Sequence, residues 1–328
     1  MGEEVTPAPS RPEPSRERPK VIYVMGSGRS GSTILGVTLG NCEGIFYAGE
    51  LDTWLPRSGE PVLGGAERTR FWKAVRDEVD PGAEAPGGDV RRYMERSSLA
   101  LRVDRWPARR RLRGRYGRVT EDLYRAISRA ADASYVVDTS HFPLRARELQ
   151  RLGGIDLYLI FLFRDPHGVV DSFARLIKRR DVFERRLREL STNANLWVTH
   201  LLSVYVFLCH RRDRRMVVRH EDFLADPEGV VLDILRRVGS PAGMPDLSSL
   251  KTGFPLKGNR LIRSEVIAVR RRSPLRPPRS AMTALLQRPW TFAVSRLTPT
   301  AQGAAGVGGG EHELHREPSA EPAREGGA

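Results

Sequence analysis

The sequence has few cysteines and no long apolar run, and each of these absences excludes a class of protein. Only Cys42 and Cys209 occur among the 328 residues, so disulfide bonds cannot form a framework that holds the fold together. No Cys-x-x-Cys pair is present to suggest a metal site. The longest apolar runs lie near residues 155–163 and 201–209. Both fall far short of the roughly 20 residues that span a bilayer.

The two ends of the chain also lack apolar runs. Residues 1–19 are rich in Pro, Glu and Arg, without the apolar core of a signal peptide. Residues 299–328 consist largely of Gly, Ala, Glu and Pro. Such compositions cannot bury enough apolar surface to fold, so they predict a disordered leader and a disordered tail. We therefore expect a cytoplasmic protein with no membrane span.

Acidic residues are the scarcer charge. The chain has 54 Lys and Arg against 40 Asp and Glu, which gives a formal net charge of +14. This excess favours an anionic ligand. The basic residues are nevertheless spread along the whole chain and recur at predicted strand ends, without the interleaved aromatic residues of a nucleic-acid-binding surface. We therefore expect no nucleic-acid partner.

The most informative segment is residues 21–36, with the sequence VIYVMGSGRSGSTILG. It reads as a buried strand, a glycine loop and the start of a helix, which together form an anion site. Gly26 and Gly31 have the spacing of a phosphate-binding P-loop, but Ser32 occupies the position of the P-loop lysine. The basic residue, Arg29, lies inside the loop instead. The loop is therefore expected to bind a phosphate-like anion without the usual ATP-binding lysine.

Strands and helices alternate over residues 20–240, which predicts an α/β fold with a central parallel sheet flanked by helices in three layers. The expected strands are residues 21–25, 44–48, 135–137, 157–163 and 216–218. The expected helices are residues 71–79, 90–103, 121–133 with Thr120 as N-cap, 142–152, 166–179, 181–212, 227–239 and 281–286. Trp197, at helical spacing from Leu201, is expected in the core.

Residues 102–118 contain eight arginines together with Trp106 and Tyr116. This segment reads either as a solvated basic face beside a helix or as a mobile acceptor-binding segment that favours acidic substrates.

Three clusters of basic residues with hydroxyl or amide groups come at strand ends or in a late loop. The first is the loop at residues 29–33. In the second, Arg164 ends a strand, and Ser172 lies about two turns into the next helix, on the face of that helix shared by Asp165 and Val169. Arg164 and Ser172 together suit one phosphate. The third cluster is Lys257, Gly258, Asn259 and Arg260. Two phosphate sites on one sheet suggest a nucleotide phosphorylated at both ends of its ribose.

These motifs resemble the sulfotransferases that use 3′-phosphoadenosine 5′-phosphosulfate (PAPS), a P-loop-like family. Residues 29–33 (RSGST) match the loop that binds the 5′-phosphosulfate in that family, and Arg164-Asp165-Pro166 through Ser172 matches its 3′-phosphate segment. The loop variant, AGEL at residues 48–51, RHED at 219–222 and GN at 258–259 are most similar to bacterial and carbohydrate-type members. The resemblance covers residues 20–265, with a variable acceptor-binding insert at about 52–118. A basic segment at 266–298 follows.

The resemblance implies in-line transfer of a sulfuryl group from PAPS to an acceptor, commonly a hydroxyl of a small molecule or a carbohydrate, without a metal. The nucleotide would be bound by Gly28, Arg29, Ser30, Gly31, Ser32, Thr33, Arg164, Ser172, Lys257, Gly258, Asn259 and Arg260. Arg29 stands where the family often has Lys. Because a guanidinium stays protonated, Arg29 would stabilise the leaving oxygen electrostatically rather than donate a proton to it.

Two residues compete for the role of the base that accepts the acceptor proton. His141 precedes Phe142-Pro143, much like the Thr-His-x-Pro segment of cytosolic sulfotransferases, and an imidazole can take a proton near neutral pH. Glu50 follows the second predicted strand, and some carbohydrate-type members use Glu. The alternative roles are a helix-capping residue for His141 and an ion pair, with Arg29, for Glu50.

Two other functions stay open at this level. A P-loop nucleotide kinase or NTPase would share the loop, and a non-catalytic nucleotide- or nucleic-acid-binding module would share the charge. The missing lysine at position 32 argues against the first function, and the distribution of the basic residues argues against the second.

Overall fold

The computed structural model describes residues 18–79, 94–95, 106–175, 182–269, 271 and 280–298. The leader, the tail, most of the predicted helix at 90–103 and part of the basic C-terminal segment lie outside these residues. Five parallel strands form the sheet: β1 (Lys20–Gly26), β2 (Ile45–Gly49), β3 (Tyr135–His141), β4 (Asp156–Phe163) and β5 (Arg215–Arg219), in the order β2-β3-β1-β4-β5. The predicted parallel α/β fold is confirmed.

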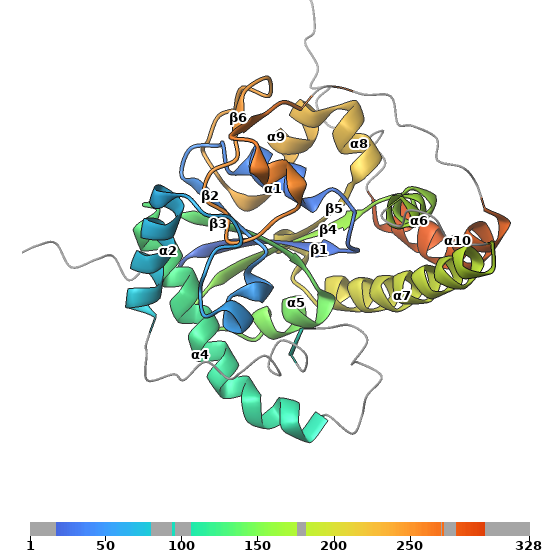
Figure 1. Ribbon diagram of the computed structural model, residues 1–328, viewed down its shortest axis with the longest axis horizontal. Helices are drawn as coiled ribbons and strands as arrows, with labels where there is room; N and C mark the ends of the chain where they lie inside the picture. The colour runs from blue at the N-terminus through green and yellow to red at the C-terminus, as the bar shows by residue number, and fades with distance from the viewer. Residues whose placement is uncertain are drawn as a thin grey trace, which may run out of the picture.

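Helices cover both faces of the sheet, because the side chains of β1 alternate between two cores (Figure 1). One face carries α1 (Ser32–Leu39), α8 (His220–Ala225) and α9 (Pro227–Val238). The other carries α2 (Ala66–Glu78), α4 (Trp106–Ala130), α5 (Pro143–Leu149) and α7 (Val182–Leu208). Beside α7 lie α6 (Pro166–Ala174) and α10 (Ala281–Leu297).

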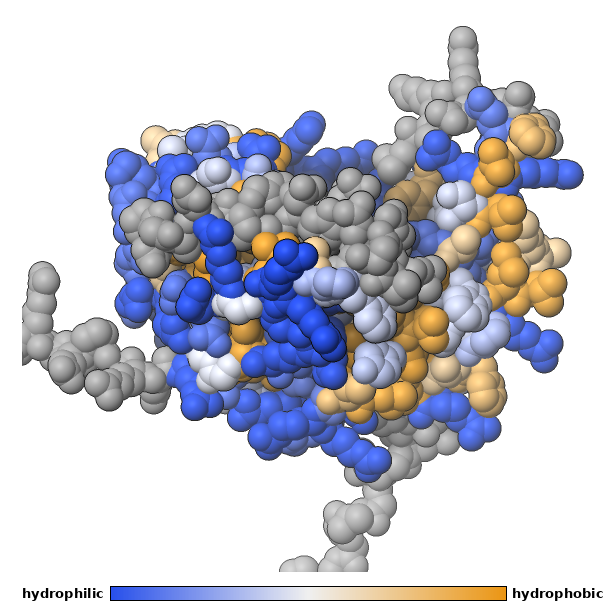
Figure 2. Space-filling view, turned by 90° about the horizontal axis from the view of Figure 1, so that it is seen from below, coloured by the Kyte–Doolittle hydropathy of each residue, from blue (hydrophilic) through white to orange (hydrophobic). Residues whose placement is uncertain are grey.

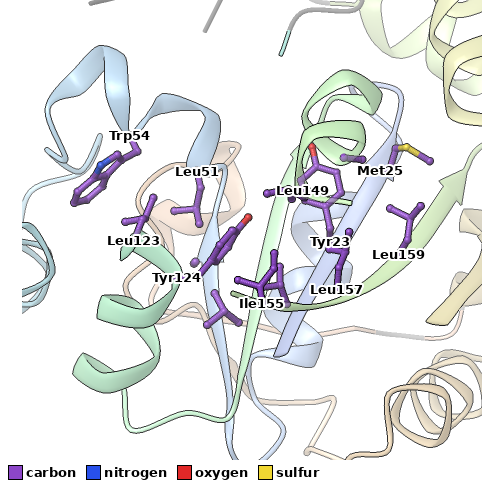
Figure 3. Close-up of a cluster of buried hydrophobic side chains, with 14 of the residues drawn as sticks. Tyr23, Met25, Leu51, Trp54, Leu123, Tyr124, Leu149, Ile155, Leu157 and Leu159 are labelled. Atoms are coloured by element: carbon purple, nitrogen blue, oxygen red, sulfur yellow. The ribbon is translucent and has the colours of Figure 1, made fainter. Parts of the chain in front are cut away.

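The core beneath β1 extends from the strands to the segment after β2. Figure 3 shows Tyr23 and Met25 of β1 on the same side of the sheet as Leu123 and Tyr124 of α4. Leu51 lies in the 3₁₀ turn η1 (Leu51–Thr53), and Trp54 precedes a second turn, η2 (Leu55–Arg57). The segment that follows β2 is therefore fixed by burial of its own apolar side chains.

The prediction that a helix begins after an N-cap at Thr120 is wrong, because α4 begins fourteen residues earlier. The helix starts at Trp106, and the Thr120 hydroxyl donates a hydrogen bond to the Tyr116 carbonyl oxygen (2.7 Å) inside it. Arg109 and Arg113 pair with the buried Glu148 of α5 at 2.7 and 2.8 Å. The arginine-rich segment is thus part of a helix, and two of its arginines bind a neighbouring element. Tertiary contacts of this kind outweigh the weak helix propensity of the glycines at positions 114 and 117.

Other helices also differ in length from the predictions. Helix α2 begins at Ala66 rather than at residue 71, and α7 ends at Leu208 rather than at residue 212. Helix α10 continues to Leu297 through Pro289, because buried side chains such as Gln287 pack it against α7. Helix α6 ends at Ala174, and α5 ends at Leu149. The sequence analysis also missed a small antiparallel pair, β6 (Leu250–Lys251) and β7 (Val266–Ile267). The 3₁₀ turns η5 (Arg212–Arg214) and η6 (Arg260–Arg263) complete the described elements.

Candidate functional site

The loop between β1 and α1 lies at the carboxyl end of the central strand. On one side of β1 lie β2 and β3, and on the other side lie β4 and β5, so the order of the strands reverses at β1. In open α/β sheets, ligands usually bind at the carboxyl ends of the strands at such a reversal. Arg29 has φ 69° and Gly31 has φ 95°, so the loop makes two left-handed turns. Gly31 is the N-cap of α1, and no side chain caps the helix. The first N–H groups of α1 therefore remain available to an anion, together with the positive end of the helix dipole.

Buried polar atoms gather around this loop. Within the described part of the chain, Arg29 Nε, Ser30 Oγ, Arg219 Nε, His220 Nδ1 and Glu221 Oε2 are buried and make no hydrogen bond. Burying a polar atom without a partner is costly, so such atoms mark places where a ligand or water completes the bonding. The loop atoms among them, the Ser30 hydroxyl and the Arg29 guanidinium, are donors suited to a phosphate or sulfate.

His220 packs directly against the loop. A Cβ atom on Gly31 would overlap the His220 ring, so only glycine fits at position 31. Burial and the nearby Arg164 guanidinium lower the pKa of His220 to about 4, which keeps the imidazole neutral at physiological pH. In the sequence, His220 stands out only as part of the RHED segment. Its position beside the loop could not be read from that motif.

Arg164, directly after the end of β4, connects the second predicted cluster, Arg164 and Ser172, to the loop. Its Nη1 donates a hydrogen bond to the Arg29 carbonyl oxygen at 2.8 Å. Burial lowers the pKa of Arg164, although the neighbouring Glu221 and Asp165 oppose this effect. The structure thus brings two of the three predicted clusters into direct contact.

Helix α6 begins as predicted. The Asp165 carboxylate caps it by accepting a hydrogen bond from the His167 N–H (2.9 Å), and Pro166 is at the first turn. The Glu221 carboxylate accepts from the Asp165 N–H (3.0 Å), which ties the start of α8 to that of α6. Ser172 is half-buried two turns into α6. Its neighbour Phe173 reaches the loop, within 3.6 Å of where a Cβ on Gly28 would lie.

His141 ends β3, the strand beside β1. Its Nε2 is 4.0 Å from the position that a Cβ on Gly28 would occupy, so the imidazole borders the loop. His141 has φ 58°, a left-handed conformation that is uncommon for a residue with a side chain. The Tyr23 hydroxyl holds the next residue by donating to the Phe142 carbonyl oxygen (2.9 Å). The imidazole is therefore presented from a strained but firmly supported turn.

Glu50 lies after the edge strand β2, two strands away from the loop. Its carboxylate pairs with Lys257 Nζ at 2.7 Å, and its N–H donates to the Lys257 carbonyl oxygen at 2.8 Å. The ion pair expected with Arg29 is therefore made with Lys257 instead. A lysine from the late loop reaches Glu50 because residues 256–257 run alongside the end of β2.

The other residues of the third cluster make contacts of their own. Gly258 approaches the Tyr47 hydroxyl, which hydrogen bonds to the Thr139 hydroxyl (3.3 Å). Asn259 caps the turn η6 by accepting from the Leu261 N–H (2.8 Å). Arg260 is exposed.

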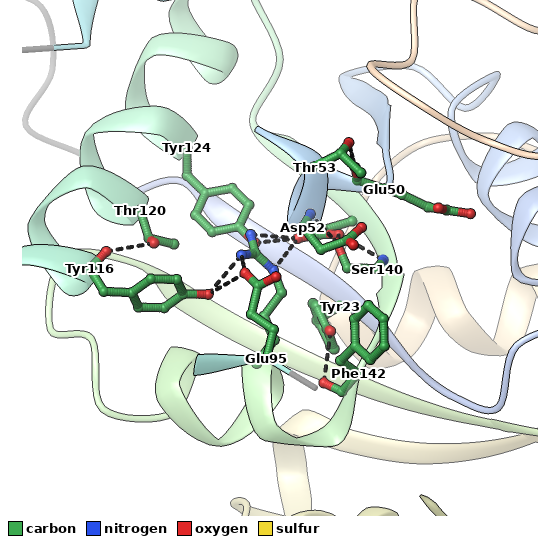
Figure 4. Close-up of polar contacts among 12 residues, drawn as sticks. Tyr23, Glu50, Asp52, Thr53, Glu95, Tyr116, Thr120, Tyr124, Ser140 and Phe142 are labelled. Carbon is green, nitrogen blue, oxygen red and sulfur yellow. Dashed lines mark hydrogen bonds and ion pairs between the residues drawn. The ribbon is translucent and has the colours of Figure 1, made fainter. Parts of the chain in front are cut away.

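A buried charged cluster includes chain neighbours of both candidate bases, Asp52 near Glu50 and Ser140 beside His141, and the sequence does not reveal most of it (Figure 4). Asp138 accepts hydrogen bonds from the Ser140 side chain and from Tyr124 (2.7 Å), and Arg145 pairs with it at 3.1 Å. Ser140 in turn accepts from the Asp52 N–H (3.0 Å), close to Glu50 in the chain. The cluster therefore ties the segment after β2 to the end of β3.

Glu95 anchors the insert to this cluster. Its carboxylate accepts from Arg145 Nη1 (2.6 Å) and from the Tyr116 hydroxyl (2.7 Å). Burial raises the pKa of Glu95 to about 7, although the Arg145 guanidinium opposes the shift. In the sequence, Glu95 is one charged residue within the predicted helix at 90–103, and that pattern does not identify a buried partner.

None of the described helices is long and apolar enough to cross a membrane. Within the same residues no group of three His, Cys, Asp or Glu side chains is arranged to hold a metal ion.

Comparisons with known proteins agree on one family. A family model described as "Sulfotransferase family" matches residues 19–245. The sulfotransferase domain of the Synechococcus PCC 7002 olefin synthase superimposes with a TM-score of 0.50 at 20% identity, covering 85% of this chain and 97% of that one. The sulfotransferase domain of the curacin biosynthetic pathway gives 0.49 at 17% identity, covering 83% and 98%. A Mycobacterium tuberculosis H37Rv sulfotransferase gives 0.45 at 17% identity, covering 68% of each chain. No curated protein sequence matches.

Proposed function

Since this chain belongs to the sulfotransferase family, we propose that it transfers a sulfuryl group from PAPS to an acceptor hydroxyl. The observation that carries the proposal is the contact between the loop and Arg164. Uncapped N–H groups and unpartnered donors form one anion site, and the Arg164 guanidinium beside them provides a second. A nucleotide with a phosphate at each end of its ribose needs two such sites.

Each residue has a defined task in this proposal. The N–H groups of residues 31–33 and the Ser30 hydroxyl bind the 5′-phosphate, and Arg164 with Ser172 binds the 3′-phosphate. Arg29 stabilises negative charge on the bridging oxygen as its bond to sulfur breaks. The acceptor oxygen forms the new bond to sulfur and gives its proton to the base. Adenosine 3′,5′-bisphosphate leaves with the electron pair of the broken bond.

We propose His141 as the base rather than Glu50. His141 Nε2 borders the loop at Gly28, whereas Glu50 lies two strands away and already pairs with Lys257. His141→Asn is expected to lower kcat by about 100-fold or more, in the range for loss of a general base. Glu50→Gln should have a smaller effect on kcat. Steady-state rates of both variants test this, and a larger loss for Glu50→Gln would reverse the assignment.

The overall proposal is tested by comparing two donors. Purified protein is incubated with a panel of hydroxyl acceptors and either PAPS or ATP, and the products are analysed by mass spectrometry. We expect a mass gain of one sulfuryl group, with release of adenosine 3′,5′-bisphosphate, from PAPS alone. Transfer from ATP alone would make the protein a kinase and overturn the proposal.

A further inference from the structure

The outer face of α7 carries a regular series of exposed apolar residues. They recur at alternating spacings of four and three residues: Phe183, Leu187, Leu190, Ala194, Trp197, Leu201, Val204 and Leu208. We call this series the α7 stripe. Val204 is half-buried and the other seven are exposed, with Phe183 74% and Leu187 57% accessible. This spacing is the heptad repeat by which one helix packs against another.

The stripe is separate from the face that α7 buries in its own core. Asn193, Leu196, His200, Ser203 and Phe207 are the inward-facing residues, and all of them are buried. A helix on a single domain needs only one face that packs against its neighbours, but α7 carries the apolar stripe in addition to its buried face.

The prediction that Trp197 lies in the core is wrong. It remains 40% exposed, and its ring meets Trp290 of α10 edge-on at 5.1 Å. Its position in the stripe, rather than on the inward face, keeps it near the surface.

We propose that the α7 stripe is the interface of a homodimer, in which α7 packs antiparallel against α7 of a second copy. In a twofold interface, residue i meets residue j and j meets i. In the antiparallel register that we propose, each stripe residue faces the partner residue whose number, added to its own, gives 391. Trp197 faces the partner's Ala194, Leu190 faces the partner's Leu201, and Leu187 faces the partner's Val204. The largest side chain of the stripe thus meets the smallest, as interdigitated packing requires.

A parallel pair would fit poorly. It would place Trp197 on Trp197 and leave a gap where Ala194 meets Ala194. It would also align Arg185, Arg186 and Arg188 with the same three positive charges of the second copy. The antiparallel arrangement instead places these arginines beside the C-terminal end of the partner helix, where the dipole is negative.

The size of the stripe also suits a dimer. Figure 2, seen from below, shows apolar side chains at the right of the molecule, the end at which α7 and α10 lie in Figure 1. With Tyr205 beside it, 52% exposed, the stripe offers on the order of 700 Å² of apolar surface. A stable interface buries about 800 Å² on each partner, and single domains rarely expose a larger apolar patch than this one.

The first experiment measures mass in solution. Sedimentation equilibrium of the full chain at about 1–50 μM should show a dimer, and Leu190→Lys should weaken dimerisation at least 100-fold because the change occurs twice in the interface. Leu232→Glu on α9, an exposed leucine outside the stripe, is the matched control and should leave the dimer intact. Circular dichroism should show that both variants are folded. A wild-type monomer throughout this range, as expected if another part of the same chain covers the stripe, would overturn the proposal.

The second experiment tests the register. Leu190→Cys and Leu201→Cys are made separately, each together with Cys209→Ser to remove the exposed native thiol. Under mild oxidation, a mixture of the two proteins should form a disulfide-linked dimer, whereas neither protein should do so alone. Cross-linking of either variant by itself would contradict the antiparallel register. Both experiments are independent of enzymatic activity, so they can fail while the sulfotransferase proposal stands.

Discussion

Arg29 combines two features that point to a role in the transition state. Its backbone is left-handed, and its buried Nε has no hydrogen-bond partner among the described residues. We expect Arg29→Ala to lower kcat by about 100- to 1,000-fold, the range for loss of one charge-stabilising donor. Affinity for adenosine 3′,5′-bisphosphate should fall less than tenfold, because the loop N–H groups remain. Steady-state kinetics measures kcat, and titration calorimetry measures the affinity for adenosine 3′,5′-bisphosphate. If both fell by the same factor, Arg29 would be a binding residue without a special role in the transition state.

Arg164 acts at the other anion site and should show the opposite pattern. Its guanidinium bonds the Arg29 carbonyl oxygen, so it supports the loop as well as a phosphate. Arg164→Ala should weaken binding of adenosine 3′,5′-bisphosphate by about 10- to 100-fold, as expected for loss of one charge-assisted contact. Arg164→Lys keeps the charge without the planar fork and should fall in between. Unchanged affinity in titration calorimetry would remove Arg164 from the nucleotide site.

At the scale of elements, His200 couples α7 to α10. Its Nδ1 lies 3.3 Å from the Gln287 side-chain oxygen, and burial lowers its pKa to about 4 despite that contact. Between pH 4 and 6.5 the unfolded chain therefore binds more protons at this residue than the folded chain does. His200 accordingly contributes stability that is present above pH 6.5 and is lost as the pH falls toward 4.

The lowered pKa of His200 predicts a pH-dependent difference in stability between the wild type and His200→Gln. The wild type should lose up to about 3 kcal/mol more of its free energy of unfolding between pH 6.5 and 4 than the variant does. Urea unfolding of both proteins at several pH values measures the difference, and using the difference cancels other titrating groups such as His220 and Glu95. Parallel pH profiles for the two proteins would show that His200 is not buried in its neutral form.

For the whole molecule, nucleotide binding and folding are linked. The proposed site is assembled from the ends of several strands, so only the folded chain can hold the ligand. Adenosine 3′,5′-bisphosphate at 100 times its Kd should therefore add about 2.7 kcal/mol to the free energy of unfolding. The same concentration of ATP, which lacks the 3′-phosphate, should add clearly less. Equal stabilisation by both nucleotides, in urea titrations, would argue against a 3′-phosphate site.

The sequence alone determined the sheet and the loop, because both depend on local patterns. Apolar runs gave four of the five strands within one residue at each end, whereas β3 continues four residues beyond its predicted end to His141, and the glycine spacing predicted the turn before α1. The start of α6 was also predicted from a local pattern, the Asp165 N-cap followed by Pro166. Helix lengths were predicted less well, because the extra turns of α4 and α10 are stabilised by contacts with distant residues such as Glu148.

Only the tertiary structure decided which side chains meet. It paired Glu50 with Lys257 across 207 positions of the chain, and it put His220 against Gly31. It also separated the buried face of α7 from the exposed α7 stripe, leaving Trp197 in the stripe. Chain folding brings such residues together through the arrangement of whole elements, and no local pattern encodes that arrangement. The sequence thus determined the kind of site, and the tertiary structure determined its neighbours.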